Sequence, residues 1–202
     1  MKNFLKKRWP WLLAVCVLAV ALVFVLTRGQ REQNAGMPTL MVETPQKLSK
    51  AETTEFTLDV TISDLGDALY PAMSMSIAFD ASRLEFLGVE EGNVFVYNTE
   101  NTTGQQLPEW SYDVASSNAS GKINIMYLDL TGGKHAFSKN LLAEDDNVVL
   151  RLRFRLKGSV RAGDVMDLIV EDAVFAASNE NESLAMTRDT LYVRNGKLVI
   201  GE

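Results

Sequence analysis

The chain has 202 residues, 47% of them apolar and 23% charged, and its formal net charge is −6. This composition is ordinary for a globular protein, and the length allows one or two domains. Residues 1–38 hold six basic residues and one acid, which leaves a charge of −11 for residues 39–202. A domain this acidic repels phosphate, so no nucleic-acid partner is expected. The acidity serves solubility or matches a basic or cation-assisted protein partner.

An apolar run near the N-terminus predicts a membrane anchor. Trp11–Leu26 is sixteen apolar residues without interruption, and as a helix it would be about 24 Å long. Extending it to residues 9–27 brings it close to the ~30 Å hydrocarbon thickness of a bilayer. The basic residues of positions 1–8 precede it, which the positive-inside rule places in the cytoplasm. We expect residues 1–8 to be a cytoplasmic tip and residues 9–27 a transmembrane helix.

The segment after the apolar run predicts a tether for one extracellular domain. Residues 28–38 are polar and aperiodic, which is typical of a short flexible spacer. Residues 39–202 would then form a single domain outside the cell, in a single-pass protein of the cell membrane. A cleaved signal peptide has the same order of charges and is the alternative. No good small-x-small cleavage site follows the run, which favours an uncleaved signal anchor.

From residue 39 onward, apolar residues recur at every second position, the period of a β-strand. The pattern is clearest over residues 56–62 and 149–156. Asn195 and Gly196 lie between two β-rich runs and predict a hairpin. Further strands are expected at residues 40–43, 84–89, 94–97, 110–114, 122–130 and 166–170, with weak helical periodicity only at 138–143. Eight or nine short strands indicate an all-β antiparallel sandwich with one core.

The strand expected at residues 72–79 has two very different faces. Met73, Met75, Ile77 and Phe79 share one parity and are predicted to face the core. The opposite face, which carries Ala72, Ser74 and Ser76, is nearly bare. A polar turn follows at Asp80. Because its side chains are so small, this face of the strand is suited to close approach by another molecule.

Residues suited to catalysis are scarce. Cys16 is the single cysteine, so no intrachain disulfide or multi-cysteine metal site can form. His135 is the single histidine, and its glycine-rich turn is more typical of a solvated side chain. The acidic residues 144–146 lack the regular spacing of a calcium loop, although a solvated turn of this kind can hold an ion. We expect no enzyme activity, no cofactor and no resident metal.

Two further patterns allow more than one interpretation. Arg151, Arg153 and Arg155 line one face of a strand, where charges discourage edge-to-edge aggregation; a partner site is the alternative. Trp110 and Tyr112 share a parity, as do the aromatic pairs that stack sugars in carbohydrate-binding sandwiches. Core packing is the more common use of such a pair. A carbohydrate-binding or adhesive domain with a polysaccharide partner is therefore the alternative function.

The order of segments in residues 39–201 resembles the bacterial cohesin domain. The resemblance is carried by FTLDVTISDL, YPAMSMSIAFDASRLEFLGVEEG, GKINIMYLDLTGG, VVLRLRFRLKGSVRAGD, EDAVFAAS and a closing RNGKLVIGE. It implies a nine-stranded jelly-roll β-sandwich without catalytic activity. Cohesins are receptor modules of cellulosomes and related cell-surface assemblies, and they bind the calcium-loaded dockerin modules of other proteins through one flat sheet face.

The resemblance also implies which side chains would touch a dockerin. They come from three strands that match the family's binding face, with Trp110–Val114 as the neighbouring strand. Met126 and Leu128 would then point inward, and so would Asn124. The expected contact residues are Ala72, Ser74, Ser76, Ile125, Tyr127, Asp167, Ile169 and Glu171.

The chain departs from the family's pattern in two respects. Cohesins that bind dockerins tightly often carry Asn or Asp on the strand that here has Ala72, Ser74 and Ser76. One module also follows an expected membrane anchor, whereas large scaffolds string several cohesins together. The simplest interpretation is a membrane-tethered single receptor, and a cohesin-like fold that serves another ligand is the alternative.

Overall fold

In a computed structural model, the chain forms two compact units, Met1–Gly36 and Met37–Glu202. The structure describes most of the second unit: residues 37–45, 47–49, 54–63, 65, 68–92, 109–133, 135–138, 147–178 and 185–201. The expected anchor and residues 28–36 of the expected spacer lie outside these residues, as do the strand at 94–97 and the acidic turn at 144–146. Within the described segments, no helix is both long and apolar enough to cross a bilayer.

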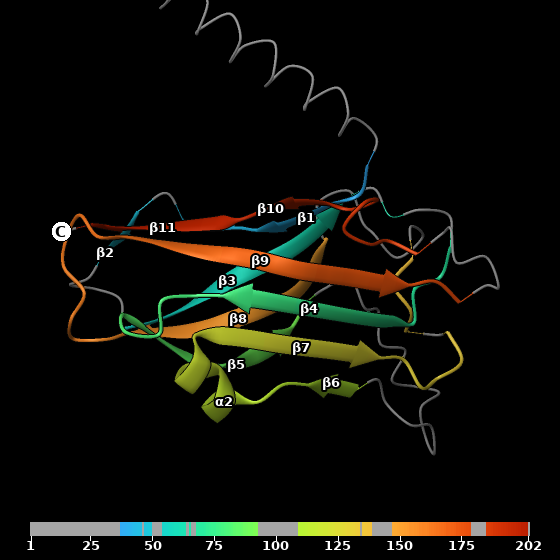
Figure 1. Cartoon of the computed structure of the whole chain (residues 1–202), viewed down its shortest axis with the longest axis horizontal. Helices are drawn as coiled ribbons and strands as arrows, with labels where there is room; N and C mark the ends of the chain where they lie inside the picture. Colours follow the sequence, from blue (N-terminus) through green and yellow to red (C-terminus); the bar gives the residue numbers. More distant parts are fainter. Residues whose placement is uncertain are drawn as a thin grey trace, which may run out of the picture. The chain divides into compact units, whose positions relative to one another are not determined.

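The second unit is a sandwich of two β-sheets (Figure 1). One sheet has the order β10 (Tyr192–Arg194), β1 (Thr39–Val42), β3 (Glu55–Ser63), β8 (Val148–Leu156) and β5 (Leu84–Glu91). The other has the order β2 (Leu48–Ser49), β11 (Gly196–Gly201), β9 (Val165–Ala176), β4 (Ala72–Ala78), β7 (Lys122–Leu128) and β6 (Glu109–Ser111). The all-β sandwich is confirmed, and the described residues form eleven strands where nine were expected.

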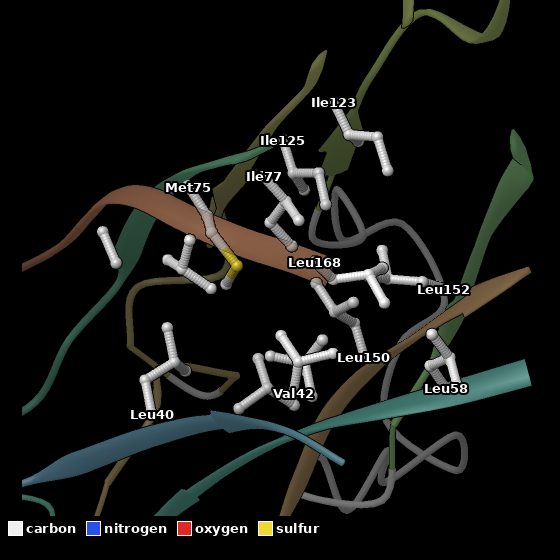
Figure 2. Packing of buried hydrophobic residues seen from close by; sticks show 14 of the residues in the cluster. Leu40, Val42, Leu58, Met75, Ile77, Ile123, Ile125, Leu150, Leu152 and Leu168 are labelled. Atoms are coloured by element: carbon white, nitrogen blue, oxygen red, sulfur yellow. The ribbon is translucent and has the colours of Figure 1, made fainter. Parts of the chain in front are cut away.

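The core lies between the two sheets and follows the alternation of the sequence (Figure 2). Strands β3, β4 and β8 contribute to it with buried side chains from alternate positions: Leu58, Val60, Ile62, Met73, Met75, Ile77, Leu150, Leu152 and Phe154. Full burial of each such side chain contributes about 1.5–3 kcal/mol to folding. The parities predicted for these three strands are therefore confirmed.

Asn195 and Gly196 do not form the predicted hairpin. Strand β10 pairs in parallel with β1, whereas β11 pairs antiparallel with β9, so the chain changes sheets at this point. The Asn195 amide oxygen accepts a 2.9 Å hydrogen bond from the Val170 backbone N–H. A Cβ added at Gly196 would lie 2.9 Å from Val42 Cγ1 and 3.0 Å from Thr44 Cγ2, so this position favours glycine because two side chains pack against it rather than because it forms a turn.

A short helix, α2 (Val114–Ser120), follows β6 where the sequence predicted that the strand would continue. The Asp113 side chain caps its first turn by accepting the Ser116 N–H at 2.6 Å. Gly121 ends it with a left-handed φ of 71°. Local capping thus overrides the alternation that predicted a strand to residue 114. The possible helix at residues 138–143 lies almost wholly outside the described residues.

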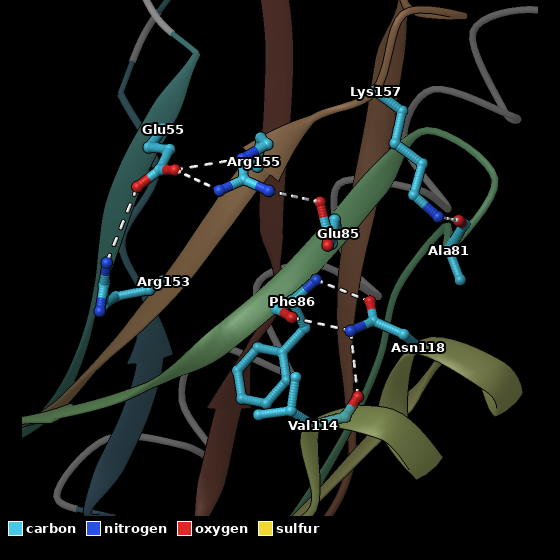
Figure 3. A network of polar contacts seen from close by, with 9 residues as sticks. All are labelled: Glu55, Ala81, Glu85, Phe86, Val114, Asn118, Arg153, Arg155 and Lys157. Atoms are coloured by element: carbon cyan, nitrogen blue, oxygen red, sulfur yellow. Dashed lines mark hydrogen bonds and ion pairs between the residues drawn. The ribbon is translucent and has the colours of Figure 1, made fainter.

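Helix α2 is joined to β5 of the other sheet by one side chain (Figure 3). The Asn118 amide accepts the Phe86 N–H at 2.8 Å and donates to the Phe86 carbonyl at 2.8 Å. These two bonds are the pair that a neighbouring strand would make with the edge of β5. Asn118 therefore links the two layers beside β6 and β7.

The three arginines of β8 form cross-strand ion pairs on the outer surface of the five-stranded sheet (Figure 3). Arg155 lies 2.5 Å from Glu55 on β3 and 3.0 Å from Glu85 on β5. Arg153 and Arg151 pair with further acids on the same strands, Glu90 and Asp59. Exposed pairs of this kind contribute about 0–1 kcal/mol each. This surface is covered by mutually compensated charges rather than by open cations.

Candidate functional site: the outer face of the six-stranded sheet

The outer face of β9–β4–β7 carries the candidate site, with small side chains along its middle. On β4, Ser74 is exposed, and Ala72 and Ser76 are half-buried. Their predicted orientation away from the core is confirmed. Because β4 is paired on both sides, its backbone is rigid and its low side chains form the floor of the face.

The predicted orientation of β7 is wrong. Ile125 and Tyr127 are 2% and 0% exposed, whereas Met126 and Leu128 are 57% and 41% exposed. The reason is register, because directly paired residues of neighbouring strands point to the same side of a sheet. Ile125 pairs with the inward residue Met75, and Figure 2 shows both side chains in the core. Residues 125–128 are all apolar, so alternation in this half of β7 could not fix its orientation.

Tyr127 has a structural role inside the sandwich instead of a contact role outside it. Its ring lies 4.7 Å from that of Trp110 and 4.9 Å from that of Phe137, measured between ring centroids. Its hydroxyl donates a 2.7 Å hydrogen bond to the backbone carbonyl of His135. Tyr127 thereby holds the loop after β7 against the core.

On β9, Asp167, Ile169 and Glu171 are exposed as predicted, but the strand contains a bulge that the alternation missed. Val170 pairs with Ile77 and Asp172 pairs with Ser76, so Glu171 is an extra residue. After it, the outward parity changes, and Asp172 joins the outer face. The sequence signal of such a bulge is the pair of consecutive acidic residues, Glu171 and Asp172, in an otherwise alternating strand.

The register places the outer residues in rows across the strands. Ser74 lies between Val174 of β9 and Met126 of β7, and one row along, Ser76 lies between Asp172 and Asn124. The Ser76 hydroxyl donates a 2.7 Å hydrogen bond to the Asn124 amide oxygen. The face is therefore apolar toward one end of the strands and polar toward the other. Asn124 points outward, contrary to its predicted orientation.

An ion pair marks the polar end of the face. Lys122 of β7 lies 2.7 Å from Glu171 of the β9 bulge. Ala78 of β4 lies between these strands in the register, and its small side chain leaves room for the pair to form above it. The bulge thus ties β9 to β7 across the middle strand.

A groove of about 490 Å³ crosses this face from β9 to the start of α2. Its floor is made by Ser74, Ser76 and Asn124, and Asp172 lies at its β9 side. Tyr112 and Asp113 line the other side, where the chain leaves β6 and enters α2. This groove could not be predicted from the sequence, because it depends on helix α2, which was not predicted.

Trp110 and Tyr112 do not form a platform for stacking a sugar. Trp110 is half-buried and packs against Tyr127 within the core. Tyr112 is 37% exposed and packs edge-on against Phe86 of the other sheet, with ring planes at 74°. The expected core role of Trp110 is confirmed, and the aromatic pair is divided between two environments.

His135 is buried, so the prediction of a solvated loop histidine is wrong. Its side chain is held by Thr131, whose hydroxyl oxygen lies 3.0 Å from His135 Nδ1. The Asp129 carboxylate accepts hydrogen bonds from the backbone N–H groups of Thr131 and His135. These contacts stabilise the turn after β7. Within the residues that the structure describes, no cluster of three metal-ligating side chains is found.

Comparison with known families decides the identity of this sandwich. The model of the cohesin domain matches residues 42–190. The chain belongs to the cohesin family. The match covers most of the second unit and includes every strand of the outer face described above. A search of curated proteins finds no match.

Solved cohesins share the fold at low sequence identity. The third ScaC cohesin of Acetivibrio cellulolyticus, solved with the ScaB dockerin, is 13% identical, with a TM-score of 0.60; the match covers 82% of this chain and 100% of that one. The OlpA cohesin of Clostridium thermocellum, also solved with a dockerin, is 17% identical, with a TM-score of 0.59 and coverage of 81% and 99%. A cohesin of Clostridium acetobutylicum is 21% identical, with a TM-score of 0.56 and coverage of 82% and 91%.

Proposed function

We propose that this protein is a non-catalytic receptor module that binds a dockerin through the outer face of its six-stranded sheet. The observation that carries the proposal is the cohesin-family match over residues 42–190, together with a sheet face that exposes Met126, Leu128 and Ile169 beside a low central strand. Met126 and Leu128 lie next to each other on the outer face of β7, and exposed apolar side chains that lie together on a sheet surface indicate a surface for protein binding.

The composition of the face supports protein binding. Apolar side chains lie beside the small residues of β4, and Asp167, Glu171 and Lys122 lie toward one end. Interfaces between proteins combine apolar contacts with polar and charged groups in this way. The expected contact set keeps Ala72, Ser74, Ser76, Asp167, Ile169 and Glu171, and it gains Asn124, Met126, Leu128 and Asp172 in place of Ile125 and Tyr127.

Calorimetry with a panel of dockerins tests this proposal. We expect a 1:1 complex in calcium and loss of binding when EDTA removes calcium, because the metal stabilises the dockerin rather than the receptor. The unfolding temperature of the receptor alone should be the same in calcium and EDTA. Failure of every dockerin to bind under both conditions would contradict the proposal.

We also propose that residues 9–27 anchor the receptor in the cell membrane, with residues 1–8 in the cytoplasm and the sandwich outside. The length of the apolar run and the basic residues before it support this. The full chain should sediment with membranes and be released by detergent but not by alkaline carbonate. Its intact mass should include residues 1–38. A mass that corresponds to a product cleaved after the apolar run would identify a signal peptide instead.

Carbohydrate binding is not favoured, because Trp110 packs into the core and leaves Tyr112 without an aromatic partner for stacking a sugar on the outer face. Affinity electrophoresis in gels that contain polysaccharide provides the check. We expect the mobility of the protein to be the same with and without the polysaccharide.

A further inference from the structure

The groove on the outer face is acidic, and this charge restricts which group of a partner can occupy it. Two carboxylates, Asp172 and Asp113, line it from opposite sides, and its floor carries hydroxyl and amide groups beside the apolar side chain of Met126. Among the described residues, no lysine or arginine lies within ion-pair distance of either carboxylate. Of the two nearby cations in the described segments, Lys122 of β7 is paired with Glu171, and Arg188, which lines a neighbouring hollow together with Asp172, forms no ion pair with it. The groove therefore has a negative charge that the described part of the chain does not neutralise.

Covering this groove without adding a cation would be unfavourable. A partner that lies on the face removes water from Asp113 and Asp172, and a desolvated charge that lacks a counter-charge opposes binding. Asp113 cannot move away, because its carboxylate caps α2 through the Ser116 N–H. The apolar residues Met126 and Leu128 lie farther along β7 and require aliphatic contacts instead.

We infer that the groove receives a lysine or arginine side chain of the docked protein, whose neighbouring aliphatic residues cover Met126 and Leu128. This inference rests on the proposed function, and it adds the chemistry and orientation of the partner. The basic end of the partner lies between Asp172 and Asp113, and its apolar end lies toward Leu128. An arginine would make full use of the site, because its planar group donates five N–H bonds to the surrounding carboxylate, hydroxyl and amide oxygens.

The net negative charge of the whole domain also favours a basic partner. Residues 39–202 carry a formal charge of −11, which raises the local concentration of basic partners and their rate of association. The ion pairs of the five-stranded sheet compensate the acids on that side. The acids of the groove are thus distinct from the compensated surface on the opposite sheet.

A selection experiment tests the inference directly. A display library presents calcium-loaded dockerins with randomised surface positions. It is selected in parallel against two forms of the full chain in detergent, the wild type and the variant Asp172→Lys. Asp172 is exposed, and its side chain forms no hydrogen bond or ion pair with the described residues, so the variant should fold; circular dichroism checks this. Asp113→Asn keeps the capping oxygen and removes the charge. Glu91→Lys, on β5 of the other sheet, is the control for the same change in net charge.

We expect the wild type to enrich lysine or arginine at one library position, and Asp172→Lys to enrich aspartate or glutamate there. Selected wild-type binders should lose about tenfold or more in affinity for Asp172→Lys and show a smaller loss for Asp113→Asn. Their affinity for Glu91→Lys should be unchanged.

If dockerins bind but both receptors select the same sequences, only this inference is overturned. If no dockerin binds the wild type, the proposed function fails with it. A wild-type dimer that Asp172→Lys dissociates would identify a second copy as the occupant and overturn the inference.

Discussion

Asn118 shows how one side chain can close the edge of a sandwich. Strand β5 is the last strand of its sheet, and the Asn118 amide satisfies both backbone groups of Phe86 there. A third bond, to the Val114 carbonyl, holds the amide in the required orientation. The same side chain also fixes α2, which forms one side of the groove. The groove therefore depends on a residue outside its lining.

Asn118→Ala should lower the free energy of unfolding by about 2 kcal/mol, because it leaves the Phe86 N–H and carbonyl without their side-chain partner. Urea denaturation measures the change. Asn124→Ala is the matched control, since the Asn124 side chain accepts a single bond from Ser76 on an exposed surface. If both variants lose the same amount of stability, Asn118 has no special role in joining the layers.

Tyr127 illustrates a residue whose role could not be assigned from its type. An aromatic residue on an apolar strand suits an interface as well as a core, and only the pairing with inward residues of β4 places it inside. The contrary signals were Lys122 and Asn124, which share the parity of Met126 and would have pointed inward with it. Substitution of Tyr127 would therefore test folding, and a test of binding must use Met126 or Ser74.

At the level of elements, alternation predicted the strands that have one polar and one apolar face. Strands β3, β4 and β8 lie with the predicted residues inside. It did not orient β7, where residues 125–128 are all apolar, or anticipate the β9 bulge, which depends on the neighbouring strand. The exchange of sheets at Gly196 was also hidden, because a hairpin and a crossover use the same small, polar residues. Long-range pairing decided each of these cases.

The turn between β4 and β5 depends on Asp80. Its carboxylate accepts hydrogen bonds from the Ser82 hydroxyl and from Arg83. These bonds, the one from Ser82 first, hold the pKa of Asp80 below its ordinary value of 3.8. A lowered pKa stabilises the fold above pH 3.8, and this contribution is lost as the pH falls through the pKa of the folded state.

Asp80→Asn should therefore be less stable than the wild type near neutral pH, and the difference should shrink as the pH falls below 3.8. Urea midpoints measured across this range give the comparison. Ser82→Ala retains the carboxylate and removes one donor, so its profile should lie between those of the wild type and Asp80→Asn. A difference between wild type and Asp80→Asn that does not change with pH would contradict this role of the carboxylate.

At the level of the whole molecule, the two sheets present opposite kinds of outer surface. The five-stranded sheet carries a row of ion pairs centred on β8, which keeps it hydrated and discourages aggregation. The six-stranded sheet exposes small and apolar side chains around β4 and a groove with two acids. A receptor with one binding face requires this division. We therefore expect substitutions on the two faces to have different effects on binding.

The most direct measurement is calorimetric titration of a calcium-loaded dockerin into two arginine variants. Ser74→Arg places a long charged side chain on the low middle of β4, whereas Thr57→Arg places the same side chain on an exposed position of β3. Both side chains are solvent-exposed, so both variants should unfold at the wild-type temperature. We predict that Ser74→Arg abolishes binding and that Thr57→Arg binds as the wild type does. Equal binding by both variants would contradict the assignment of the six-stranded face as the receptor surface.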